Sequence, residues 1–97
     1  MKKDHVRLKN DADELLDRLA DRLPHDNLKD LRTFNFVGEW NELANNLLAI
    51  LVRNEIPVSP DEKEELRNLL YFFDLPVPYY DFINDRDAIL ASLNVSS

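Results

Sequence analysis

The stretch "WNELANNLLAILVRNEIPVSPDEKEELRNLL", residues 40–70, holds the two strongest helix signals in the chain. In its first half, apolar residues recur at the spacing of one helix face: Trp40, Leu43, Ala44, Leu47, Leu48 and Leu51. Asn54 and then Pro57 mark the end of this helix, because the residue before a proline is pushed out of helical geometry. The pattern predicts a central helix followed closely by a second one.

The second half of the stretch is a helix start. Ser59 can cap the helix, Pro60 suits its first position, and Glu62 then falls at the third, which completes a capping box. Acidic residues in the first turn also complement the positive end of the helix dipole, each by about 0.3–1 kcal/mol. Part of the acidic run from Asp61 to Glu65 therefore has a structural explanation.

The residues before this stretch predict two further helices. An apolar stripe from Leu8 to Leu23 repeats at helical spacing and is stopped by Pro24. A shorter amphipathic segment follows around residues 28–34, and we expect Asp26 or Asn27 to cap it.

After Leu70, the residues Asp74, Pro76 and Pro78 break the fourth helix. The segment "LPVPYYDF", residues 75–82, predicts a bend and a short turn of helix, and a last helical segment runs from about Asp85 to Leu93. Because Tyr79 and Tyr80 are adjacent, at least one of them should be partly exposed, whereas Phe73 and Phe82 are expected in the core.

These signals predict an all-α fold: a single compact antiparallel bundle of four to five helices. The chain contains one glycine, and leucine, isoleucine, valine and phenylalanine make up about a third of its 97 residues. This fraction is well above the roughly 20% below which disorder is typical. We expect one domain over residues 1–97, with weakly ordered ends at 1–4 and 94–97.

The composition favours a soluble cytoplasmic protein. There is no cysteine, so no disulfide or thiolate chemistry is expected. The first residues lack the apolar run of a signal peptide, and the longest apolar run, residues 47–52, is far shorter than the ~20 residues of a membrane span.

The net charge of −7 is unevenly distributed. Residues 1–37 carry eight basic and eight acidic side chains, whereas residues 38–97 carry four basic and eleven acidic ones. Such a field repels nucleic acid and anionic lipid and attracts basic partners. Acidity for solubility alone is the competing interpretation.

No pattern in the sequence indicates a catalytic site or a cofactor site. His5 and His25 stand twenty residues apart, and neither has a histidine or carboxylate three or four residues further on, as a metal site requires. One glycine cannot form a phosphate-binding loop. The charge argues against a DNA-binding helix-turn-helix. The helix that would enter the DNA groove begins Pro60-Asp61-Glu62, whereas binding to phosphates requires lysine and arginine there. We therefore expect neither an enzyme nor a nucleic-acid or membrane binder.

Binding to a basic protein is the function that these features favour. An exposed tyrosine ringed by carboxylates is typical of the anchor and rim of a protein interface. If the tyrosines merely pin the last helix to the bundle, this interpretation fails. The predicted partner-binding residues are Glu55, Asp61, Glu62, Glu64, Glu65, Asp74, Tyr79, Tyr80, Asp81 and Asp85.

The run "EWNELANNLLAILVRNEIPVSPDEKEELRNLLYFFDL", residues 39–75, resembles MafI-type immunity proteins of bacterial polymorphic toxin systems. The matching features are a helix that starts with an aromatic residue, Trp40, then an acid with Ile-Pro at Glu55 to Pro57, and then Ser59 with acids opening a leucine-rich helix. Members of this family neutralise MafB-type toxins or those of contact-dependent growth inhibition (CdiA, with its CdiI immunity proteins).

The resemblance implies a non-enzymatic inhibitor that binds the C-terminal domain of a cognate toxin, as a monomer in a 1:1 complex. Toxins of these systems are often nucleases acting on RNA, whose clefts are basic because they hold phosphates. The alternatives are a small helical adaptor or regulatory subunit and, least favoured by the charge, an antitoxin that binds its own promoter.

Overall fold

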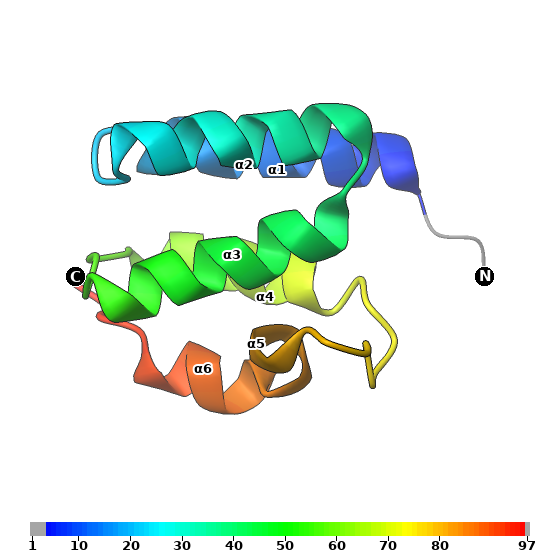
Figure 1. Ribbon diagram of the computed structural model, residues 1–97. Helices are drawn as coiled ribbons and strands as arrows, with labels where there is room; N and C mark the ends of the chain where they lie inside the picture. Colours follow the sequence, from blue (N-terminus) through cyan, green and yellow to red (C-terminus); the bar gives the residue numbers. More distant parts are fainter. Residues whose placement is uncertain (1–3, 97) are drawn as a thin grey trace.

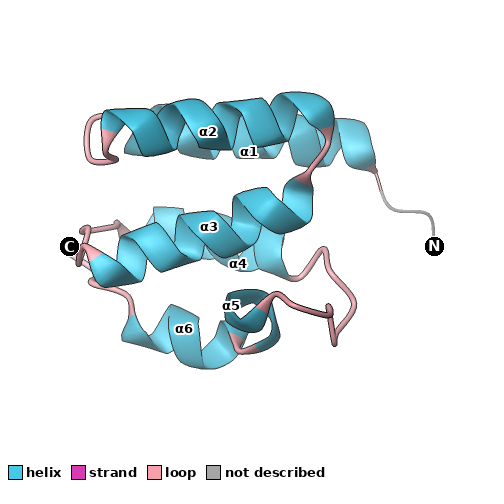
Figure 2. Cartoon of the chain, viewed as in Figure 1, coloured by secondary structure: helices cyan, strands magenta, loops and turns pink. Residues whose placement is uncertain are grey.

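Six helices lie within residues 4–96, the part of the chain that this computed structural model describes. They are α1 (His5–Leu19), α2 (His25–Val37), α3 (Trp40–Arg53), α4 (Pro60–Leu70), α5 (Asp81–Asn84) and α6 (Arg86–Ser92). Figures 1 and 2 show three layers: α1 with α2, α3 with α4 in the middle, and α5 with α6 on the other side. The predicted all-α bundle is confirmed, with six helices where four to five were expected.

The core lies between the layers and consists mainly of leucine. The predicted stripe of α3 is buried from Leu43 to Leu51, and this helix contacts α2, α5 and α6, so it is the central helix expected from the sequence. Full burial of each such leucine contributes about 1.5–3 kcal/mol relative to an exposed position. Phe73 is buried as predicted, and Phe82 is partly buried against the core.

The start of α2 differs from the prediction. The helix begins at His25, with Pro24 in the N-cap position and no side-chain cap, so neither Asp26 nor Asn27 caps it. Pro24 has an extended backbone (φ −56°, ψ 138°) and turns the chain directly into the helix. Asp26 consequently lies inside the first turn, where its charge complements the helix dipole.

A buried asparagine ties the first three helices together at the α2–α3 junction. The Asn35 amide nitrogen donates to the Asp13 carboxylate (2.7 Å) and to the Lys9 carbonyl (3.1 Å) on α1, while its oxygen accepts from Trp40 Nε1 (3.0 Å) on α3. Gly38 makes the sharp turn between α2 and α3 possible with φ 76°, a conformation that favours glycine.

Hydrogen bonds fix both ends of α4, and side chains of α3 and α6 also hold the chain that follows it. The capping box at the start of α4 is present as predicted, with Ser59 and Glu62 bonded to each other's backbone N–H. At its other end, Arg86 donates to the carbonyls of Leu70 and Phe73 (3.2 and 3.0 Å). The Asn45 side chain then accepts from two N–H groups at the start of α5, the short helical turn that the sequence predicted near this position.

Both ends of the described range make hydrogen bonds to the rest of the chain. The Asp4 carboxylate accepts from Arg7 N (3.0 Å) and caps α1. Val58 donates to the carbonyl of Asn94 and accepts from Ser96 N, both at 2.9 Å. Residues 1–3 and 97 lie outside the described residues.

We expect Asn35→Ala to lower the free energy of unfolding by about 1–3 kcal/mol, because it leaves Trp40 Nε1 and the Asp13 carboxylate without the bonds that Asn35 supplies. Urea unfolding followed by tryptophan fluorescence measures the loss. Asn10→Ala on the exposed side of α1 is the control and should change stability by less than about 0.5 kcal/mol. Equal effects of the two substitutions would contradict a role for the Asn35 network.

Candidate protein-binding surface

The ten predicted partner-binding residues do not form one surface. Glu62 forms an internal ion pair, and Glu65 lies on the flank of α4 that faces α1. Glu55, Asp61 and Glu64 are exposed elsewhere on and before α4, and the other five residues lie between α4 and α6.

Glu62 is an internal residue, which corrects its predicted role in partner binding. It is only 6% exposed, and its two carboxylate oxygens accept from the two Nη atoms of Arg22 at 2.8 and 2.6 Å. One of them also accepts from the Ser59 N–H (2.8 Å). The hydrogen bond with Arg22 is the main reason why the pKa of Glu62 falls to about 2 from its ordinary value of 4.5. Its charge therefore joins α4 to the end of α1.

Glu65, one turn further along α4, is half-buried and faces other acids. It pairs with Arg18 of α1 at 2.7 Å. Burial nevertheless raises the pKa of Glu65, and the nearby carboxylates of Glu14 and Asp11 add to this rise against the lowering effect of Arg18. Burial is thus the main cause of the raised pKa, and the carboxylates of α1 make a smaller contribution.

These carboxylates border a groove of about 600 Å³ between α1 and α4, which we call the α1/α4 groove. Buried leucines of both helices form its floor: Leu8, Leu15 and Leu69. The rim carries four acids, Asp4, Asp11, Glu14 and Glu65, with Arg7 as the basic residue among the lining residues. Arg7 lies 3.7 Å from Asp11 in an exposed i,i+4 pair, which leaves the rim with an acidic excess.

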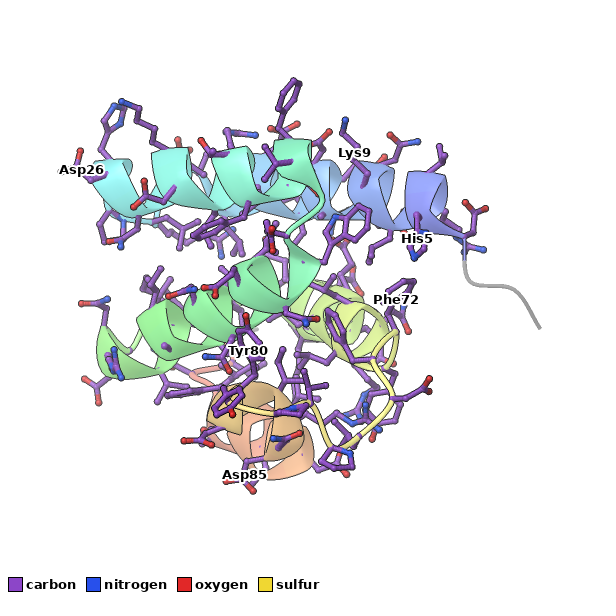
Figure 3. The ribbon with its side chains drawn as sticks, turned by 45° about the vertical axis from the view of Figure 1, so that its right-hand side comes forward. His5, Lys9, Asp26, Phe72, Tyr80 and Asp85 are labelled. Carbon is purple, nitrogen blue, oxygen red and sulfur yellow. The ribbon has the colours of Figure 1, made fainter. Side chains whose placement is uncertain are left out.

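Aromatic rings make one end of the α1/α4 groove rigid. Phe72, which lines the groove, meets His5 edge to face with ring centroids 5.5 Å apart, and His5 stacks on Trp40 at 5.2 Å. Figure 3 shows His5 and Phe72 facing each other across the end of the groove. This contact joins the start of α1 to the end of α4.

The remaining acids on and before α4 are exposed but lie outside the groove lining. Glu64 pairs loosely with Arg67 one turn further on (3.4 Å), and Asp61 is exposed in the first helical turn. Glu55 lies in the loop between α3 and α4, with a left-handed backbone (φ 50°) and its carbonyl bonded to the Asn94 side chain. The sequence prediction therefore combined acids of separate environments.

The two tyrosines take opposite roles, and the prediction that at least one is exposed is confirmed. Tyr80 packs against the core and donates its hydroxyl to Glu42 of α3 (2.8 Å), a bond that raises the pKa of Tyr80. Tyr79 is 97% exposed. Three exposed acids belong to the same region: Asp74, Asp81 and Asp85. Figure 3 shows Tyr80 and Asp85 in the part of the molecule formed by α3, α5 and α6.

Sequence reasoning missed the acids that α1 contributes to the groove: Asp4, Asp11 and Glu14. The equal numbers of acidic and basic residues in 1–37 concealed them, because a net charge does not report on which helix face the charges lie. Placing the charges on the helical wheel would have grouped these acids on the flank beside the apolar stripe.

The described residues contain no group of three or more histidine, cysteine or acidic side chains arranged to hold a metal ion. In the same range, no helix has both the length and the apolar content required to cross a membrane. Comparison of the sequence with family models and curated proteins, and of the fold with solved structures, found no match. The surface itself is thus the main guide to function.

We expect Glu62→Gln to lower the free energy of unfolding by about 2–3 kcal/mol at pH 7, because it removes the charge that Arg22 and Ser59 bind. The folded state lowers the pKa of Glu62 from 4.5 to about 2, so the unfolded chain takes up this proton first as the pH falls. The contribution is therefore complete above about pH 4.5 and is lost towards pH 2.

Urea unfolding of both proteins at several pH values tests this prediction. The difference in stability between wild type and Glu62→Gln should shrink steadily below pH 4.5. Glu64→Gln is the control, because Glu64 is mostly exposed and its loose pair with Arg67 should contribute less than about 0.5 kcal/mol. A difference that does not depend on pH would contradict the ion-pair explanation.

Proposed function

We propose that the protein is a non-enzymatic immunity protein that binds the C-terminal domain of a cognate toxin in the cytoplasm and neutralises it. The toxin domain would be a nuclease with a basic cleft, bound 1:1 by a monomer of this protein. The observation that carries the proposal is the α1/α4 groove, whose apolar floor is bordered by four carboxylates. The resemblance of residues 39–75 to MafI-type immunity proteins is an independent support.

The charge of the groove favours a cationic partner. Carboxylates that lie close together repel one another, and a cation that binds among them relieves this repulsion. A field of one sign also speeds the encounter of two proteins, to as much as ~10⁸–10⁹ M⁻¹s⁻¹ at low salt. Fast capture is what an inhibitor of a lethal enzyme requires.

The apolar floor gives such a partner more than charge attraction. Lysine and arginine place aliphatic stems on apolar surface while their charged ends reach polar groups. A side chain that lies on Leu8 and Leu69 can thus reach the carboxylates of Asp11, Glu14 or Glu65 on the rim. The groove combines the two features that a basic side chain needs for specific binding.

Inhibition follows directly if the bound cations belong to the nuclease cleft. Lysine and arginine of such a cleft hold the phosphates of the nucleic acid. Carboxylates of this protein that bind the same lysine and arginine side chains would compete with the phosphates and exclude the nucleic acid. No chemical step by this protein is needed.

Co-expression with the toxin domain encoded by the neighbouring gene tests the proposal. We expect cells to survive only when both proteins are made, and a stable complex to be purified from them. A neighbouring gene of metabolism or regulation, with no toxin domain to bind, would instead favour the helical adaptor.

We expect Asp11→Lys/Glu14→Lys to slow association with that toxin domain at least about tenfold at low salt, because the reversed charges repel the basic cleft. The difference should narrow as salt is added. Stopped-flow measurement at several salt concentrations gives both results.

The matched control is Asp26→Lys/Asp30→Lys, which makes the same change of net charge on exposed residues of α2. Figure 3 shows Asp26 at the end of the α1–α2 layer opposite to His5 and Phe72. If both double variants slow association equally, net charge is sufficient and the groove is not the docking site.

A further inference from the structure

Tyr79 combines an unusual backbone conformation with a side chain that is almost fully exposed. Its φ of 73° lies in the left-handed region, which bulky residues rarely adopt and glycine adopts easily. Its side chain is 97% exposed, so the ring adds little to the core. A strained backbone that displays an aromatic ring to solvent is a common feature of binding sites.

The chain on both sides of Tyr79 is fixed. The Asn84 side chain accepts from Val77 N (2.6 Å) and donates to Val77 O (2.8 Å), which holds the loop before Tyr79. After it, Tyr80 is held by its bond to Glu42, and Asn45 of α3 receives two N–H groups at the start of α5. These hydrogen bonds hold the backbone on both sides of Tyr79 without a partner.

The surroundings of Tyr79 are acidic. Residues 71–85 carry three aspartates, Asp74, Asp81 and Asp85, and no lysine or arginine. Arg86, the nearest basic residue in the sequence, is turned inward: it donates to the carbonyls of Leu70 and Phe73 and lies over the Tyr71 ring at 3.9 Å. Asp81 is thus the acid nearest to the exposed Tyr79 ring in the sequence, and Arg53 of α3 also lies beside this segment, over the Phe82 ring at 5.7 Å.

We propose that Tyr79 is a pre-organised anchor for an arginine side chain of the protein partner. The guanidinium would stack on the ring and pair with a neighbouring aspartate, such as Asp81. Because the loop is already ordered, little conformational entropy is lost on binding. The proposal rests on the proposed function for the identity of the partner, and it assigns that partner a contact distinct from the α1/α4 groove.

The Tyr79→Gly variant tests the binding role of the ring without disturbing the fold. Glycine removes the ring and suits the left-handed backbone, so the melting temperature should stay the same or rise. Dissociation of the neighbouring toxin domain should become at least about tenfold faster, as for loss of a binding hot spot. Tyr79→Phe is the control: it keeps the aromatic face and should dissociate at nearly the wild-type rate. A folded Tyr79→Gly protein that releases the toxin domain at the wild-type rate overturns the anchor, while the proposed function stands.

A second measurement does not depend on the toxin domain. Titration of the isotope-labelled protein with a hexa-arginine peptide, followed by NMR, should shift the signals of Tyr79 and Asp81, and hexa-lysine should shift them less. Tyr79→Gly should lose the difference between the two peptides at this loop. If the wild-type protein does not bind the toxin domain, the proposed function fails and this titration decides the anchor: shifts confined to the α1/α4 groove would overturn it.

Discussion

The ion pair between Arg22 and Glu62 is the contact on which the arrangement of the bundle depends. Glu62 caps its own helix through Ser59 and binds both Nη atoms of Arg22 at the end of α1. Arg22 also donates to the carbonyls of Arg18 and Pro57, so one guanidinium joins α1, the loop after α3 and the start of α4. With α1 held at this end and the His5–Phe72 contact at the other, the two helices lie antiparallel, and the α1/α4 groove is the space between them.

In this arrangement, the acidic residues differ in how much they contribute to the stability of the fold. Breaking a largely buried ion pair leaves an uncompensated charge, which is far more costly than losing an exposed one. Glu62 belongs to the first kind, and Asp11, which pairs with Arg7, belongs to the second. Only part of the acidity of the chain therefore holds the fold together. Some exposed carboxylates border the apolar floor of the α1/α4 groove, and others, such as Asp26 and Asp61, lie elsewhere on the surface.

Most of what the sequence predicted correctly depends on near neighbours along the chain, although the cap of α2 was predicted wrongly. Helix faces, the Ser59 capping box and the exposure of one of two adjacent tyrosines all follow from local spacing, and the structure has them. It did not predict which helix meets which. Periodicity places Glu62 at a helix start, but its burial depends on Arg22, forty residues away in the chain. The sequence did predict a short helical turn near α5, but not that Asn45 of α3 binds its first N–H groups, nor that the groove joins acids from two helices that lie far apart in the sequence.

The two proposed contacts differ in the step of binding that they would control. Charge on the rim of the groove acts over about a Debye length, roughly 8–10 Å at physiological salt, and so acts on encounter before contact is made. Tyr79 acts only at contact, because stacking is short-ranged, and so governs release. The rim acids Asp11 and Glu14 and the Tyr79 ring are not part of the Arg22–Glu62 pair, and Asn84 holds the loop without the Tyr79 ring. Under the proposed function, these residues could change to suit another basic target while the Arg22–Glu62 pair stays in place.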